Sequence, residues 1–172
     1  MSAKRIVMLD FDGVINRVSN IGYYIGTAYE PPIERQLALR VGNMVNKLDA
    51  SVVVSSDWRH SYTLAELRQF LGDYAGIAAK RVLGTTERGG WKSVRGQEIE
   101  NWLKEAGEPV RLAVLDDNHL GRFNMDRVRP WFVKTTPQVG VSEANIKDAS
   151  RLLTTGPIFS MQSIAEGELT NA

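Results

Sequence analysis

The sequence contains no cysteine, and this absence rules out several kinds of chemistry at once. A chain without thiols forms no disulfide bond, holds no zinc through cysteine and performs no thiol catalysis. It suits a reducing compartment, and we expect a cytoplasmic protein. The chain also lacks an apolar run long enough for a membrane span or a signal peptide, since Met1–Arg5 leads directly into the first predicted strand. The sequence therefore predicts no membrane partner.

A strong charge of either sign is also missing. Lys and Arg number 21 against 20 Asp and Glu, which gives a formal net charge of +1. Overall charge therefore does not draw the chain to nucleic acid, and any such binding has to come from a local patch. There is no internal repeat, heptad or low-complexity tract. With 43% hydrophobic and 24% charged residues, the 172-residue chain is expected to form one globular domain over residues 1–172, of unknown oligomeric state.

The most informative stretch is an apolar run that ends in two carboxylates and a glycine. Ile6–Leu9 has the length and composition of a strand buried on both faces, as in the centre of a parallel sheet. Asp10 and Asp12 follow it, and both project from its carboxyl end on one side if the chain stays extended. Two like charges this close resist ionising together unless a cation lies between them, so the pair predicts a hard-metal site, most simply for Mg²⁺. Gly13 then lets the backbone turn away.

Other buried strands end in polar residues in the same way. Ser51–Ser55 is a predicted strand that runs into Ser56, and Arg111–Asp117 is another that again ends in two acids. Between them, Lys92 follows a glycine-rich loop and precedes a predicted helix. Open α/β sheets bind ligands at the carboxyl ends of their strands, so these side chains are expected at one edge of one sheet.

The alternation of strands and helices predicts an α/β fold, a three-layer sandwich on a parallel Rossmann-like sheet. Helices are expected over residues 33–49, from a capping box at Thr63 to a stop at Gly72, after Lys92, and from Ser142 to about Leu153. Further strands are expected at Ile77–Leu83 and Trp131–Lys134. Residues 14–32 are polar and punctuated by glycine, which predicts a small flap as a minimal cap, and residues 154–172 form a tail that either lies along the sheet edge or stays mobile.

The motifs resemble those of a known superfamily. The sequence Asp10–Asn16 after a hydrophobic strand looks like the first motif of the haloacid dehalogenase (HAD) superfamily of phosphohydrolases. Its second motif is a strand that ends in Ser or Thr, which Ser55 matches, with Ser56 as the competing assignment. Its third is a lysine near the start of a helix, which Lys92 matches. Its fourth is an acidic pair after a strand, which Asp116-Asp117 matches.

This resemblance implies an enzyme, a Mg²⁺-dependent phosphomonoester hydrolase. Asp10 is then the nucleophile that forms an aspartyl-phosphate, and Asp12 is the acid/base that protonates the leaving oxygen and activates water. The Asp10 carboxylate, the Asp12 main-chain carbonyl and Asp116 are implied metal ligands, with Asp117 in or just behind them. Lys92 offsets the charge of the phosphoryl group. A phosphotransferase shares every motif, and a catalytically silent binding module is the rival from another class.

A narrower resemblance concerns the substrate. Trp58-Arg59, after the strand that ends in Ser55, resembles the end of the corresponding strand in the phosphatase domains of Swiss-Army-knife RNA repair proteins, which has the pattern Thr/Ser-x-Trp-Arg. The match is imperfect, because Asp57 is an extra residue between Ser55 and Trp58. It implies a phosphorylated nucleotide or polynucleotide end as the substrate, with sugar or cofactor phosphates as the alternative. The residues assigned to substrate binding are Ser55, Ser56, Arg59 and Arg88.

Two physical features favour a polymeric substrate. A minimal cap leaves the site open, and basic side chains cluster around a loop expected to border it, where they can meet neighbouring phosphates. These are Lys80, Arg81, Arg88, Lys92 and Arg95. Tyr23, Tyr24 and Trp58 either stack on a base or pack within the protein.

Overall fold

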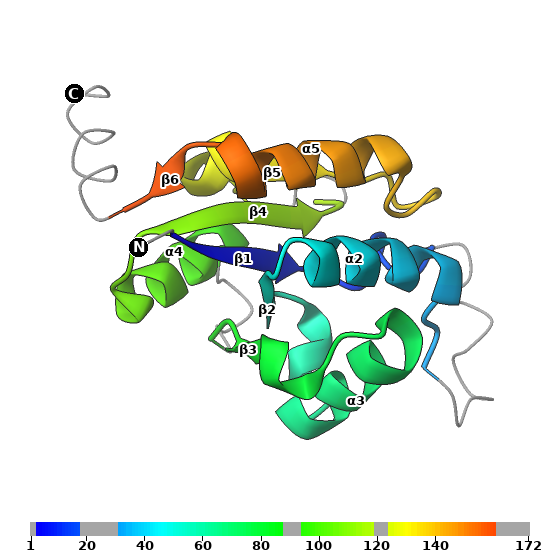
Figure 1. Cartoon of the computed structure of the whole chain (residues 1–172). Coiled ribbons are helices and arrows are strands. Elements are labelled where there is room, and N and C mark those ends of the chain that lie inside the picture. Colours follow the sequence, from blue (N-terminus) through cyan, green and yellow to red (C-terminus); the bar gives the residue numbers. More distant parts are fainter. Residues whose placement is uncertain (1–2, 18–30, 88–93, 119–123, 161–172) are drawn as a thin grey trace.

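The computed structural model describes residues 3–17, 31–87, 94–118 and 124–160. Its centre is a parallel sheet in the order β3-β2-β1-β4-β5, with β6 antiparallel to the start of β4 (Figure 1). The strands are β1 (Lys4–Leu9), β2 (Ser51–Val54), β3 (Val82–Thr85), β4 (Val110–Asp116), β5 (Phe132–Lys134) and β6 (Ile158–Phe159). From β1 the chain builds the sheet outward through β2 and β3, and it then returns to the other side of β1 for β4 and β5. The strand order thus reverses between β1 and β4, where open α/β sheets form their ligand site.

Helices cover both faces of the sheet. On one face lie α2 (Arg35–Lys47), α3 (Leu64–Ala75) and α5 (Glu143–Thr155), which share a core with alternate residues of β1, β2 and β4. On the other lie α4 (Arg95–Ala106) and the 3₁₀ segment Asp126–Trp131, which form a second core. The predicted three-layer α/β sandwich on a parallel sheet is confirmed.

The side-chain alternation of β1 positions the acids that follow it. Val7 and Leu9 lie in the core beneath α2, whereas Ile6 and Met8 lie in the core beneath α4. Because successive side chains of a strand point to opposite faces, a strand covered on both faces is apolar throughout. Asp10 is in step with Met8, so the first acid is directed to the side of α4.

Three predicted boundaries are wrong. The helix that Thr63 caps continues past Gly72 to Ala75, because the apolar stripe continues to a buried Ala75 and the left-handed residue that ends the helix is Gly76, with φ of 67°. The capping box itself is confirmed, as is the predicted start of the last helix at Ser142, which is its N-cap. The third strand begins only at Val82, since Ala79–Arg81 form a 3₁₀ turn.

The third wrong boundary is the start of the flap. Val14 and Ile15 are fully buried core residues. Their carbonyl groups accept hydrogen bonds from the main-chain N–H groups of Val141, at 2.8 Å, and Glu34, at 2.9 Å. Residues 18–30, which make up most of the predicted flap, lie outside the described residues.

Residues 154 and 155 of the predicted tail end α5, and a later part of the tail joins the sheet. Ile158 and Phe159 pair with Arg111 and Val110 at the start of β4, which confirms the sheet-edge alternative for these residues. Residues 161–172 lie outside the described part of the chain. Among the described helices, none is long and apolar enough to cross a membrane.

Candidate active site

The carboxyl ends of the parallel strands bring the predicted motifs together. The main-chain N–H of Asp10 donates to Leu115 of β4 at 3.0 Å, and that of Ser55 donates to Leu9 of β1 at 2.9 Å. Ladder bonds of this kind place Ser55, Asp10 and Asp116 side by side across β2, β1 and β4. The first, second and fourth sequence motifs therefore meet at one edge of the sheet, as predicted.

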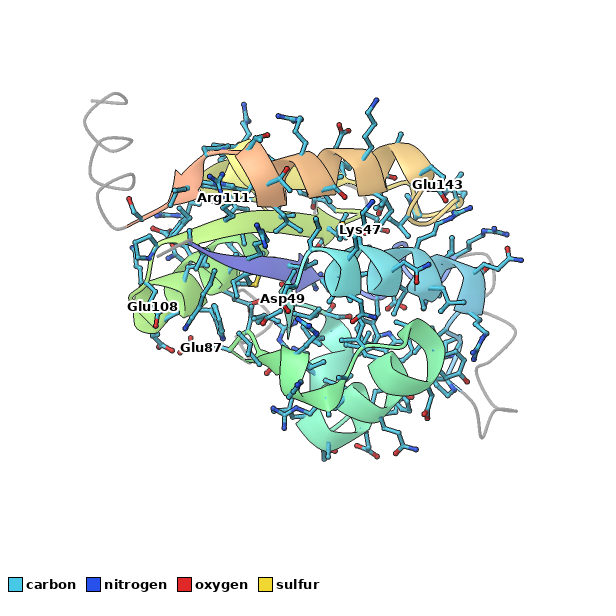
Figure 2. The ribbon with its side chains drawn as sticks, in the orientation of Figure 1. Lys47, Asp49, Glu87, Glu108, Arg111 and Glu143 are labelled. Carbon is cyan, nitrogen blue, oxygen red and sulfur yellow. The ribbon has the colours of Figure 1, made fainter. Side chains whose placement is uncertain are left out.

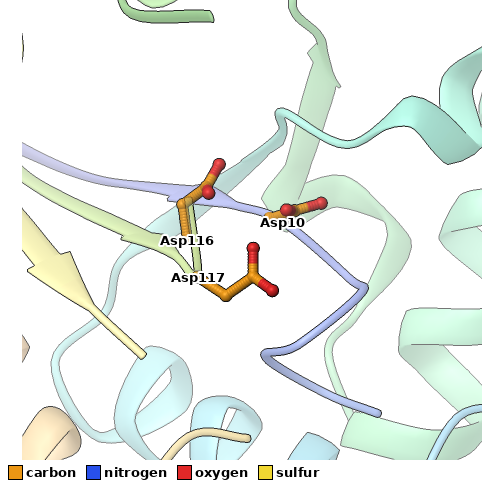
Figure 3. Close-up of side chains that lie close together, drawn as sticks. All are labelled: Asp10, Asp116 and Asp117. Atoms are coloured by element: carbon orange, nitrogen blue, oxygen red, sulfur yellow. The ribbon is translucent and has the colours of Figure 1, made fainter. Parts of the chain in front are cut away.

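Three carboxylates converge at this edge. Asp10, Asp116 and Asp117 are buried, and one oxygen of each lies within 4.8 Å of the others. Figure 3 shows their side chains directed toward a common space between the ends of β1 and β4. Carboxylate oxygens in such a group suit a hard divalent cation such as Mg²⁺. The side chain of Asp12 lies outside this group.

Gly13 makes room for one of these acids. Its φ is 73°, and a Cβ added to it would overlap the carboxylate of Asp117. A glycine is needed for both reasons, because other residues rarely adopt this conformation and their side chains would displace the acid. The turn is tied down further by Thr135, whose hydroxyl donates to the Gly13 carbonyl at 2.7 Å.

Arg95, which the sequence places among the basic residues bordering the site, lies at its centre. Its Nη1 lies 2.9 Å from Oδ2 of Asp10 and 2.9 Å from Oδ2 of Asp116, and its Nη2 lies 2.8 Å from Oδ1 of Asp57. Arg95 is the first residue of α4 and is almost fully buried. Its position in the sequence, three residues after Lys92, was the available signal, because it also follows the glycine-rich loop and precedes the apolar stripe of the predicted helix.

The other oxygens of these acids are bonded to the main chain. Oδ1 of Asp10 accepts a hydrogen bond from the Phe11 N–H at 2.8 Å, and Oδ1 of Asp116 accepts one from the Asn118 N–H at 2.6 Å. Each carboxylate is thus fixed by one amide and by Arg95. Fixed carboxylates at a strand end are oriented for reaction or metal binding before any ligand arrives.

The charges remain unbalanced in spite of Arg95. Burial, followed by repulsion from Asp116, raises the pKa of Asp10 well above its ordinary value, against the opposing effect of Arg95. Burial also raises the pKa of Asp116. The pKa of Arg95 is raised as well, because Asp10, Asp116 and Asp57 outweigh the effect of its burial. The raised pKa values of the two acids indicate that the site has too little positive charge to keep both acids ionised. A divalent cation would supply the missing charge.

The two candidate serines occupy different environments. The Ser56 hydroxyl accepts a hydrogen bond from the Trp58 N–H at 3.4 Å, and its proximity to Asp10 opposes the rise in the pKa of that acid. The Ser55 hydroxyl is buried and has no hydrogen-bond partner among the described residues, and the same holds for Thr86 on the neighbouring strand end. Ser56 therefore lies beside Asp10, whereas the Ser55 and Thr86 hydroxyls have no hydrogen-bond partner in the described part of the chain.

Arg59 is enclosed by protein groups. Its Nη2 lies 2.7 Å from Oε2 of Glu98, its Nη1 donates to the Ser56 carbonyl at 2.6 Å, and its Nε donates to the Glu87 carbonyl at 3.1 Å. The side chain is 2% exposed. Arg59 thereby joins the segment after β2 to α4 and to the end of β3. Its predicted contact with substrate stays a prediction.

Part of the predicted basic patch lies elsewhere. Arg81 is paired with Asp49 at 2.6 Å and donates to the Ala50 carbonyl at 3.1 Å, directly before β2 (Asp49 is labelled in Figure 2). Arg81 and its neighbour Lys80 precede β3, so they lie at the amino-terminal edge of the sheet, opposite the acids. Their predicted place beside the site is wrong, because the 3₁₀ turn sets them before the strand.

The aromatic prediction is resolved for Trp58. Its indole packs against Phe11 and Tyr62, with ring centroids 5.0 and 5.2 Å apart, and it is 9% exposed. Packing, the second of the two alternatives, is confirmed for this residue. Tyr23 and Tyr24 lie outside the described residues, as do Lys92 and Arg88, whose roles stay predictions.

The parallel sheet with acids at its switch point defines a domain of the haloacid dehalogenase type. A family model described as the HAD domain in Swiss Army Knife RNA repair proteins matches residues 6–146, and the chain belongs to this family. The predicted superfamily and its narrower subgroup are therefore both confirmed. Searches of curated proteins and of solved structures found no match.

Proposed function

We propose that the protein is a metal-dependent phosphomonoester hydrolase that works through an aspartyl-phosphate on Asp10. One observation carries the proposal: the Asp10 carboxylate lies at the switch point of the sheet, in contact with Arg95 and grouped with Asp116 and Asp117. Family membership supports a phosphatase or hydrolase activity in general. The choice of Asp10 as the nucleophile is the residue-level part of the proposal.

The acids fit a divalent cation. Asp10, Asp116 and Asp117 offer three oxygens within 4.8 Å of one another, and the raised pKa values of Asp10 and Asp116 indicate that Arg95 does not neutralise them. We assign these carboxylates and the main-chain carbonyl of Asp12 as the groups that would hold Mg²⁺. When bound, the ion supplies positive charge that offsets the repulsion between the Asp10 carboxylate and a phosphate dianion.

The reaction has two steps. In the first, an oxygen of Asp10 bonds to phosphorus, the bond between phosphorus and the ester oxygen breaks, and Asp12 gives its proton to the departing alcohol. In the second, water attacks phosphorus and passes a proton to Asp12, the bond between Asp10 and phosphorus breaks, and inorganic phosphate leaves. Arg95 contacts the Asp10 carboxylate and so lies where it can offset the charge of the phosphoryl group, a role that the sequence assigned to Lys92.

We assign the Ser56 hydroxyl as the group that binds the phosphoryl oxygens. The Ser56 hydroxyl lies near enough to the Asp10 carboxylate to lower its pKa, so it is within reach of a phosphoryl group bonded to that side chain. The Ser55 hydroxyl, which the sequence favoured and which has no hydrogen-bond partner within the described ranges, is the alternative ligand.

The proposed substrate is a phosphorylated nucleotide or polynucleotide end. The description of the family as a domain of RNA repair proteins supports this class. Arg88 and Arg59 keep their predicted roles in binding the substrate. Arg59 would act both by contacting the substrate and by fixing the segment after β2 through its hydrogen bonds. A small sugar or cofactor phosphate is the alternative, and a phosphotransferase would share the site.

The test is a panel of phosphomonoesters with Mg²⁺ and with excess chelator. The panel holds oligonucleotides phosphorylated at the 3′ or 5′ end, a nucleotide and two sugar phosphates, and released phosphate is measured. We expect turnover with Mg²⁺, none with chelator, and the highest kcat/KM on an oligonucleotide. Full turnover in chelator contradicts the metal assignment, and phosphate appearing on an added alcohol instead of in solution identifies a phosphotransferase.

A further inference from the structure

Asp12 is held by two side chains from different parts of the chain. The Nδ2 of Asn16 donates to Oδ1 of Asp12 at 2.8 Å, and the indole Nε1 of Trp58 donates to the same oxygen at 3.0 Å. Among the described residues, Oδ2 of Asp12 receives no hydrogen bond. One oxygen of the carboxylate is therefore fixed and the other faces no protein donor in the described part of the chain.

Both donors are themselves immobilised. Asn16 is fully buried, and its side-chain oxygen accepts a hydrogen bond from the Gly13 N–H at 3.1 Å, which fixes the orientation of its amide. It therefore presents its NH₂ to Asp12.

Trp58 is fixed by aromatic contacts instead. Its ring lies 5.0 Å from Phe11, 5.2 Å from Tyr62 and 6.2 Å from Phe70, measured between centroids. Packing on several sides leaves the indole few alternative rotamers. The buried cluster thus holds the N–H in the direction of Asp12.

We propose that Trp58 and Asn16 are positioning residues that orient Asp12 for proton transfer. By occupying Oδ1 they leave Oδ2 as the oxygen that gives its proton to the departing alcohol and then takes a proton from the attacking water. The inference rests on the proposed phosphatase function and adds to it a role for two residues that the motifs leave unassigned. Rotation of the carboxylate would otherwise direct the proton away from the leaving oxygen, and proton transfer depends on such geometry.

A substitution that removes only the N–H is the direct test. Trp58 is replaced by benzothienylalanine, which keeps the size of the bicyclic ring and carries sulfur in place of the N–H, and in parallel by Phe. The measured quantity is kcat/KM for an alkyl phosphate and for p-nitrophenyl phosphate. An alkoxide needs a proton to leave and a nitrophenolate does not, so we expect kcat/KM to fall about tenfold or more for the alkyl ester and less than about threefold for the nitrophenyl ester.

The second step gives an independent signature. Asp12 also accepts the proton of water, so its misorientation slows hydrolysis of the aspartyl-phosphate whatever the leaving group was. We expect the benzothienylalanine variant to show a burst of nitrophenolate close to one equivalent of enzyme, because the covalent intermediate accumulates. A purely structural role would not produce this burst.

The matched control is Phe70→Leu, which disturbs the same aromatic cluster without touching Asp12. It should lower both kcat/KM values by the same factor, if at all. Equal losses on the two esters in the benzothienylalanine variant, or no loss on either, overturn the positioning role while leaving the phosphatase proposal intact. An inactive wild-type protein that binds Mg²⁺ would instead reject the phosphatase proposal itself.

Discussion

At the scale of single residues, the site is organised by a shortage of positive charge. Asp10 and Asp116 share one guanidinium nitrogen, Nη1 of Arg95, at 2.9 Å from each. Burial raises the pKa of both acids because it removes them from water, and the contact with Arg95 does not compensate. Keeping both acids ionised therefore lowers the stability of the folded chain, and a bound cation would restore it.

Replacing Asp10 by Asn should abolish phosphate release and stabilise the metal-free fold. The pKa of Asp10 is higher in the folded chain than in the unfolded chain, so wild-type stability is lost as the pH rises from the unfolded value through the folded one. Above that range, a gain of about 1 kcal/mol in Asp10→Asn corresponds to a Tm higher by about 2–4 °C without metal. Added Mg²⁺ should reverse the order, because it stabilises the wild type more.

The control for this variant is Asp148→Asn, an exposed acid on α5. It should leave both activity and Tm unchanged. Activity of Asp10→Asn within about tenfold of the wild type would reject covalent catalysis by Asp10, since loss of a nucleophile removes far more rate than that.

Ser55→Ala and Ser56→Ala should separate the two serines. The Ser56 hydroxyl lies beside the Asp10 carboxylate, and loss of one such group lowers kcat by about 10²–10³ when it stabilises the transition state. The Ser55 hydroxyl is buried without a partner among the described residues, so its removal should leave the Tm unchanged or raise it. The reverse pattern, a catalytic defect confined to Ser55→Ala, would return the phosphoryl ligand to Ser55. Steady-state kinetics and thermal melting of both variants decide this.

At the scale of elements, the pattern of predicted strands could not show which side chain the start of α4 contributes to the site. The ends of β1, β2 and β4 were predictable, because buried apolar runs followed by acids or hydroxyls are visible in the sequence. The buried, central position of Arg95 was not predictable. A basic residue at the start of a helix is usually exposed, and the burial of Arg95 depends on how α4 packs over the sheet. Trp58 illustrates the same limit: its indole N–H reaches Asp12 only because Phe11, Tyr62 and Phe70 enclose the ring.

Sequence boundaries failed where tertiary contacts outweigh local preference. Gly72 was expected to end a helix that continues to Ala75, and Val14 and Ile15 were expected in a flap although they are core residues. The apolar stripe extends the helix to the buried Ala75, with Gly76 as its left-handed end, and burial in the core fixes Val14 and Ile15. The capping box at Thr63 was predictable because Thr63 and Glu66 lie within one helical turn, and Ser142 was recognisable as a helix start for the same local reason.

Arg95→Met should destabilise the metal-free protein and inactivate it. It leaves Asp10 and Asp116 buried without their shared cation, and breaking a buried ion pair from one side costs about 3–5 kcal/mol. Saturating Mg²⁺ should restore much of the stability but not the activity, because the ion replaces the charge near the acids and not the contact with the phosphoryl group. The comparison variant is Lys92→Met. If Lys92→Met loses activity and Arg95→Met with Mg²⁺ keeps it, the charge-offsetting role belongs to Lys92.

At the scale of the whole molecule, charge is close to balanced, with a net value of +1. Two of the basic residues once assigned to the neighbourhood of the site, Lys80 and Arg81, lie at the opposite edge of the sheet. For the proposed polynucleotide substrate, attraction therefore depends on a few cations near the acids, for which Arg88 is the predicted residue. Such local attraction is measurable through its dependence on salt.

For a phosphorylated oligonucleotide, kcat/KM should fall steeply with added salt, and for a sugar phosphate it should fall little. Each contact with a single-stranded phosphate contributes about −0.7 to the slope of log(kcat/KM) against log[salt]. Arg88→Ala should make this slope shallower by about that amount and weaken binding more than it slows chemistry, because a phosphate contact acts before the reaction. Arg81→Ala is the matched control, since Arg81 is paired with Asp49 at the far edge and should leave the slope unchanged.

Equal turnover of oligonucleotide and sugar phosphate, with no salt dependence for the former, would identify a phosphatase of small metabolites. An unchanged slope in Arg88→Ala alone would assign the phosphate contact to another cation and leave the nucleic-acid substrate in place.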